Sequence, residues 1–207
     1  MNQLSTTKHI FSVSVICVLM IVLAACTDES TAPLAPVDTT IVERLDLRAD
    51  SAIGWLYYSI DGDSVVSPAL AGTNEWDVRM KYLLCCGKTR NVEVYCNSGS
   101  AGSGATQAIV VSGRFESVTS LASTSVPRND NAAAPIIHFL GANPVWLYSG
   151  APNHTLVASP DKIIAIQTRK GRLVKFQFTS IYQGRPATPT QESPIGFYHF
   201  RYANLRK

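Results

Sequence analysis

The sequence predicts an all-β fold with little helix, and three observations lead to that prediction. Apolar and polar side chains alternate over short stretches, as they do on half-buried strands. Turn-forming residues separate these stretches, which is typical of hairpins. The stretches that favour helix are short or interrupted by proline, which cannot occupy a helix interior without breaking it.

The segment 76–82 is predicted to be a half-buried strand. Trp76, Val78, Met80 and Tyr82 alternate with Asp77, Arg79 and Lys81. Successive side chains of a strand point to opposite faces. One face, including Met80, is therefore expected in the core, and the other is expected to carry the charges.

Two hairpins are predicted from their turns. WLYYSI and SVV bracket Asp61-Gly62-Asp63, and KIIAIQT precedes the turn RKGR and the alternating stretch 174–178. Gly171 in the second turn can adopt a positive φ angle.

The segment 197–202 is predicted to be the last strand. Tyr198, Phe200 and Tyr202 would lie on one side, with His199 and Arg201 on the other. His199 is expected to be a solvated residue of the charged outer face.

Helix is expected only in short pieces. FESVTSLAS is long enough for two turns, and AAAPIIHFLGANPVW is cut by Pro135 and Pro144. The glycine-rich NSGSAGSGATQ is interpreted as a flexible connection between strands.

The start of the chain predicts a bacterial lipoprotein. Residues 1–25 have the layout of a signal peptide: Lys8, an apolar run and small residues at the exit. They end in LAAC, which resembles a lipobox, so Cys26 is expected to be lipidated; an ordinary cleaved signal or a retained helix is the alternative. Residues 26–40 are interpreted as anchor and tether, and 41–207 as the folded domain. Because Thr27 and not aspartate follows Cys26, the outer membrane is the expected place in the cell envelope.

Charge and cysteine content exclude some classes of protein. Without Lys8, 17 of the 18 basic residues remain against 15 acidic ones, and this mild balance does not predict nucleic-acid binding. Cys85, Cys86 and Cys96 remain in the domain, so one of the adjacent pair, such as Cys85, could form a disulfide with Cys96. Their spacing matches no usual zinc finger.

Motifs for catalysis are absent from the sequence. Gly87-Lys88-Thr89 lacks the first glycine of a phosphate-binding loop, since Tyr82 stands there, and Gln107 stands where a dinucleotide fingerprint needs glycine. No G-x-S-x-G or H-E-x-x-H motif occurs. We therefore expect a protein that is not an enzyme.

The order of several motifs resembles one known family. These motifs are WLYYSIDGDSVVSP, EWDVRM, NSGSAGSG, Phe115-x-x-Val118, VWLYSGAPNHTLVASPDKIIAIQTRKGRLVKFQFTSIY and GFYHFRY. Together they resemble the HmuY family of haem-binding lipoproteins, over roughly residues 41–202. The resemblance implies two antiparallel sheets with a groove between extended loops. It also implies haem as a cofactor and an outer-membrane haem receptor as a partner. The inserted CCGKTR departs from the family pattern.

His138 and His154 are the candidate iron ligands. Imidazole is a common axial ligand of haem iron. His154 lies on a loop before a predicted strand, and His138 lies among apolar residues; the alternatives are a polar residue at a strand entrance and a partly buried histidine with a backbone partner. Met80 is the only methionine left after the signal, so two methionine ligands are excluded.

The propionates of haem need cationic partners. Arg79, Arg169 and Arg185 are candidates, and the sequence does not choose among them.

Two functions are therefore expected from the sequence. The first is a lipid-anchored, haemophore-like protein that captures haem for uptake. The alternative is a non-enzymatic HmuY-like envelope module that binds another ligand or a protein partner.

Overall fold

The computed structural model describes residues 38–83, 92–139 and 143–206. Eleven strands and one short 3₁₀ helix occur in this part of the chain. They are β1 (Val42–Arg48), β2 (Trp55–Ser59), β3 (Ser64–Val66), η1 (Pro68–Leu70), β4 (Val78–Lys81), β5 (Val94–Cys96), β6 (Gln107–Ser112), β7 (Trp146–Tyr148), β8 (Leu156–Ala158), β9 (Lys162–Gln167), β10 (Leu173–Tyr182) and β11 (Ile195–Asn204). The all-β prediction is confirmed.

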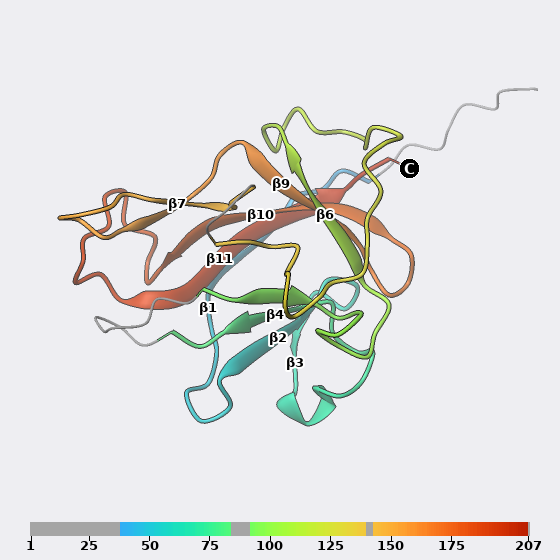
Figure 1. The fold of residues 1–207 in the computed structure, drawn as a ribbon, viewed down its shortest axis with the longest axis horizontal. Helices are drawn as coiled ribbons and strands as arrows, with labels where there is room; N and C mark the ends of the chain where they lie inside the picture. Colours follow the sequence, from blue (N-terminus) through green and yellow to red (C-terminus); the bar gives the residue numbers. More distant parts are fainter. Residues whose placement is uncertain (1–37, 84–91, 140–142, 207) are drawn as a thin grey trace, which may run out of the picture. The chain divides into compact units, whose positions relative to one another are not determined.

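The strands form two main antiparallel sheets. One has the order β1-β11-β10-β9-β6 and the other the order β3-β2-β4-β5. Figure 1 shows β9, β10 and β11 in the upper layer and β2, β3 and β4 in the lower one. A separate two-stranded sheet, β7-β8, extends from one end of the larger sheet (Figure 1).

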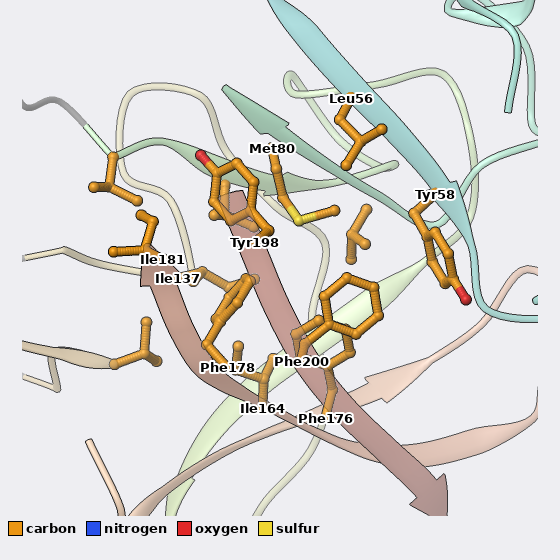
Figure 2. Close-up of a cluster of buried hydrophobic side chains, with 14 of the residues drawn as sticks. Leu56, Tyr58, Met80, Ile137, Ile164, Phe176, Phe178, Ile181, Tyr198 and Phe200 are labelled. Atoms are coloured by element: carbon orange, nitrogen blue, oxygen red, sulfur yellow. The ribbon is translucent and has the colours of Figure 1, made fainter. Parts of the chain in front are cut away.

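The core lies between the two main sheets. Leu56 and Met80 from the smaller sheet face the aromatic side chains of β10 and β11 (Figure 2). Phe176 stacks on Phe200 with ring centroids 4.7 Å apart, and Tyr58 meets Phe200 edge-on at 5.0 Å. Such pairs stabilise a fold by about 0.5–1.5 kcal/mol beyond the burial of their surface. The prediction that Met80 belongs to the core is confirmed.

Both predicted hairpins are present. Ser59 pairs with Ser64 across the turn between β2 and β3, and Leu173 pairs with Gln167 across the turn between β9 and β10. Gly171 in the second turn has a φ of 77°, as predicted.

The predicted alternation is confirmed for Val78–Lys81, in which Arg79 and Lys81 lie on the less buried face, but the prediction that Asp77 belongs to that face is wrong. Strand β4 begins at Val78, and Asp77 is 0% exposed. Its carboxylate accepts hydrogen bonds from the Ile60 amide at 2.7 Å and from the Thr106 hydroxyl at 2.9 Å. A buried carboxylate is tolerated only where such donors replace water, so Asp77 joins three segments and does not face solvent.

His199 is also buried, so the prediction of a solvated residue is wrong. Its side chain lies on the face opposite Tyr198 and Phe200, yet the residue is only 1% exposed. The imidazole contacts the Tyr182 carbonyl at 2.8 Å through Nε2, and Nδ1 accepts from the Asp46 amide at 3.3 Å. The bulge of β1 at Asp46, where the register shifts, brings this amide to the ring.

Two loop predictions also change. The FESVTSLAS stretch forms turns and extended backbone with no α-helix. The NSGSAGSGATQ stretch connects β5 to β6 as predicted, but it is closely packed: Asn97 donates to the carbonyls of Thr73 and Trp76 and accepts from the Gly104 amide. Because these hydrogen bonds hold the connection in place, the prediction that it is flexible is wrong.

Cys96 is a free thiol buried in the core. Cys85 and Cys86 lie outside the described residues, so the Cys85–Cys96 disulfide stays a prediction. The predicted signal, the lipidation site Cys26 and most of the tether also lie outside them. Within the described ranges, no helix is long and apolar enough to cross a membrane.

Candidate functional site

The β7–β8 hairpin carries one of the two predicted iron ligands and adjoins the other. Trp146 on β7 is buried against Phe178, with ring centroids 5.1 Å apart. On β8, the Leu156 amide donates to the Tyr182 hydroxyl at 2.8 Å. These contacts fix the base of the hairpin on β10, while residues 149–155 form its loop.

His154 occupies the end of that loop in an unusual conformation. Its φ is 48°, in the left-handed region that few residues other than glycine adopt. Its amide donates to the Gly150 carbonyl at 2.7 Å. Its Nδ1 is hydrogen-bonded to the Tyr148 hydroxyl, and the two rings lie 5.9 Å apart. Nε2 has no hydrogen-bond partner among the described residues, so it is the nitrogen available to a ligand.

His138 lies at the opposite end of β7. Its carbonyl accepts from the Val145 amide at 3.1 Å, and its imidazole has no hydrogen-bond partner in the described part of the chain. Val145 and Ser149 are four residues apart on extended backbone, which at about 3.3 Å per residue separates them by roughly 13 Å. The two histidines thus belong to one hairpin region but flank its two ends.

Two hollows adjoin the hairpin. The larger has a volume of about 500 Å³ and lies between hairpin residues 152–157 and residues 187–192 of the β10–β11 loop. The smaller, of about 240 Å³, is lined by β8, the end of β10 and Arg185. Ligand pockets commonly measure about 300–1,000 Å³. Neither imidazole lines either hollow, so the predicted two-histidine centre remains a prediction.

The outer side of the hairpin is apolar. Leu147 and Val157 are cross-strand partners and are 49% and 50% exposed, and Tyr148 beside them is 43% exposed. Exposed apolar patches of this kind mark interaction surfaces or ligand grooves.

The structure separates the three candidate arginines. Arg79 lies against Trp55 at 4.5 Å, and Arg169 pairs with Glu75 at 3.0 Å, in a part of the fold that neither hollow includes. Arg185 lines the smaller hollow and pairs with Glu43 at 2.6 Å. It is the candidate nearest to the hairpin.

Sequence reasoning missed the contribution of the β10–β11 loop. Residues 187–192 form one wall of the larger hollow. The signal that could have found them is the stretch GRPATPTQESP, a long connection with three prolines between two predicted strands. Among the described residues, no group of three or more His, Cys, Asp or Glu side chains could hold a metal ion.

The fold and the candidate site define the class of protein. It is an all-β protein of two main antiparallel sheets, in which the β7–β8 hairpin and the β10–β11 loop border one hollow. No family model and no curated protein matches this chain. Solved structures similar to this chain include an apo HmuY analogue of Tannerella forsythia, a candidate HmuY-like heme-binding protein of Bacteroides vulgatus and a candidate lipoprotein of Bacteroides fragilis.

These structural similarities are distant. For the three structures in that order, the identities are 12%, 11% and 10%, and the TM-scores are 0.48, 0.42 and 0.40. The matches cover 82–84% of this chain and 99%, 94% and 94% of the other chains. Two of them carry the HmuY name, the family that the motif order resembles. Similarities at this level assign no ligand.

Proposed function

We propose that this protein is a lipid-anchored, extracytoplasmic haem-binding protein that captures haem for uptake. The observation that carries the proposal is the setting of His154. Its Nδ1 is engaged by Tyr148, and a partner on one ring nitrogen orients the other toward a metal. The positive φ of His154 requires support from its surroundings, and such conformations concentrate at functional sites.

The surroundings of His154 fit a porphyrin. Leu147 and Val157 offer apolar contact, and the hollow beside the loop is large enough for part of such a ligand. In the proposal, His154 is the first iron ligand and His138 the second. Two iron bonds of about 2 Å each place the ligand nitrogens about 4 Å apart, so the two ends of the hairpin, roughly 13 Å apart along β7, would have to approach each other when haem binds.

Arg185 is the proposed propionate partner. Its guanidinium lies beside the smaller hollow, and its present partner, Glu43, is on an exposed surface. Exposed ion pairs contribute only about 0–1 kcal/mol, so exchange of Glu43 for a haem propionate costs little.

The proposed role in uptake depends on export and anchoring. The support is the signal-like residues 1–25 and the lipobox ending at Cys26. The proposed location is the outer membrane, with an outer-membrane haem receptor as the partner. The protein would bind and release haem without chemical turnover.

The test is haemin titration of the purified mature chain carrying Cys26→Ser, followed by the Soret band. The wild-type sequence should shift and sharpen the band at one equivalent of haemin. His154→Ala and His138→Ala should each weaken binding by at least about tenfold, the equivalent of 1.4 kcal/mol. Val126→Ala, at an exposed position outside the hairpin and both hollows, should bind as the wild type does.

Two outcomes would overturn the proposal. One is an unchanged haemin spectrum with and without protein. The other is a shift that survives both histidine substitutions, which would place the haem elsewhere. In the first case the alternative function, a non-enzymatic envelope module for another ligand or a protein partner, is preferred.

A further inference from the structure

Strand β6 is an edge strand without the usual protection. It pairs with β9 in continuous register from Gln107 to Ser112, without a bulge. Its sequence, QAIVVS, contains no charged residue and no proline. Proteins normally protect such edges with charges, prolines or bulges, because free backbone groups invite another strand. The other edge of the same sheet, β1, has a bulge near Asp46 and several charged side chains.

The free backbone groups of β6 can be assigned from the register. Ala108 exchanges both of its backbone hydrogen bonds with Arg128, at 2.9 and 3.0 Å, on the side away from β9. In an antiparallel ladder, residues two apart direct their amide and carbonyl to the same side. Val110 and Ser112 therefore direct theirs away from β9, and no partner for these groups occurs among the described residues.

The space beside these groups is open. After Ser112 the chain leaves the sheet, and it returns at Arg128, so that residues 113–128 form an excursion beside β6 (Figure 1). Between β6 residues 109–112 and Ser117–Ala122 lies a hollow of about 490 Å³. A paired strand lies about 4.8 Å from its neighbour, and this hollow adjoins β6 over the residues that carry the free groups.

The charges around the hollow favour an acidic occupant. Arg128 stands at one end of β6, Lys162 contacts Ser112 at the other, and Arg206 pairs through its backbone with Ser120. None of these three cations pairs with a carboxylate in the described part of the chain. Glu116 and Asp161, the acids next to this region in sequence, pair with Arg201 at 2.9 Å and with Arg114 at 3.8 Å.

We propose that β6 binds an extended, acidic segment of a partner protein, which adds to the larger sheet as a further strand. Main-chain hydrogen bonds to Val110 and Ser112 would supply affinity, and Ile109 and Val111 would contact alternate side chains. A second copy of this chain fits less well, because its own β6 edge carries the same 113–128 excursion. This site is separate from the β7–β8 hairpin and does not depend on haem.

The test uses a synthetic peptide, acetyl-Glu-Val-Thr-Val-Thr-Glu-amide, and hydrogen exchange measured by NMR on the mature chain. The Val110 and Ser112 amides should exchange rapidly in the free protein. With peptide at ten times its Kd, both should slow by about tenfold. A peptide with lysine in place of both glutamates should bind more weakly.

Substitutions at Ser112 form a matched pair. Ser112→Pro removes the outward amide but no bond to β9, and should weaken peptide binding by at least about tenfold. Ser112→Ala keeps the amide and should bind as the wild type does. Equal binding by both variants, or protection of other amides only, would refute the proposal.

Two further outcomes also contradict a partner protein. If Val110 and Ser112 are already protected in the free chain and become exposed on dilution, a second copy occupies the edge. If they become exposed only when residues 27–37 are deleted, the acidic tether of the chain itself occupies it.

Discussion

At the scale of single residues, the side chains on which the family resemblance rests have structural roles. Asp77 of the Trp-Asp motif binds the amide of Ile60, and Asn97 of the Asn-Ser-Gly motif closes its own loop. Alternation alone places Asp77 on a solvated face, because it counts positions and does not detect donors from distant segments. These residues therefore have roles in the fold.

Burial of His199 makes stability depend on pH. Desolvation lowers its pKa, and the Tyr182 carbonyl and the Asp46 carboxylate oppose that shift only in part. The unfolded chain, with a histidine pKa of about 6.5, binds the proton more readily than the folded one. The stabilising contribution of neutral His199 is therefore present above pH 6.5 or so and is lost as pH falls through the lower folded pKa.

We expect the free energy of urea unfolding to fall between pH 7 and pH 5, and His199→Gln to flatten that fall. Glutamine can keep a donor for Tyr182 without titrating in this range. An identical pH dependence in the wild type and in His199→Gln would contradict this assignment.

At the scale of elements, loops that look alike in sequence differ in how closely they are packed. Gly99 in the β5–β6 connection and Gly171 in the β9–β10 turn both have positive φ, 56° and 77°. A Cβ on Gly99 would lie 2.1 Å from the Asp130 carbonyl oxygen, whereas one on Gly171 would meet nothing within 4 Å.

Alanine at these two glycines should separate backbone strain from crowding. Gly171→Ala should lower the free energy of unfolding by about 1–2 kcal/mol, the cost of a left-handed conformation. Gly99→Ala should cost about 1–3 kcal/mol more, because the Asp130 backbone must move. Chemical denaturation of both variants measures the difference; equal losses would mean that the β5–β6 connection adapts without cost.

At the scale of the whole molecule, Cys96 reports on the integrity of the core. Its thiol lies between the two sheets, and burial raises its pKa well above the usual value, as the nearby carboxylates of Asp130 and Asp77 also do. The reactive form of cysteine is the thiolate. Cys96 should therefore react only when the sheets separate.

This prediction can be measured in a mature chain with Cys26, Cys85 and Cys86 replaced by serine, so that Cys96 is the sole thiol. Ellman's reagent should react with it at the rate of global opening and immediately in 8 M urea, a denaturing concentration well beyond the usual midpoint of small domains. Immediate reaction in native buffer would show that the core is open at Cys96.

The sequence by itself determined β2, β3, β4, β9, β10 and β11 and the turns of two hairpins, because alternation and turn residues are local. It also placed His154 on a loop beside a strand. Only the tertiary structure decided which polar residues are buried, how the hairpin and the β10–β11 loop enclose a hollow, and that β6 has a free edge. These features depend on contacts between segments far apart in the chain, and no local pattern records them.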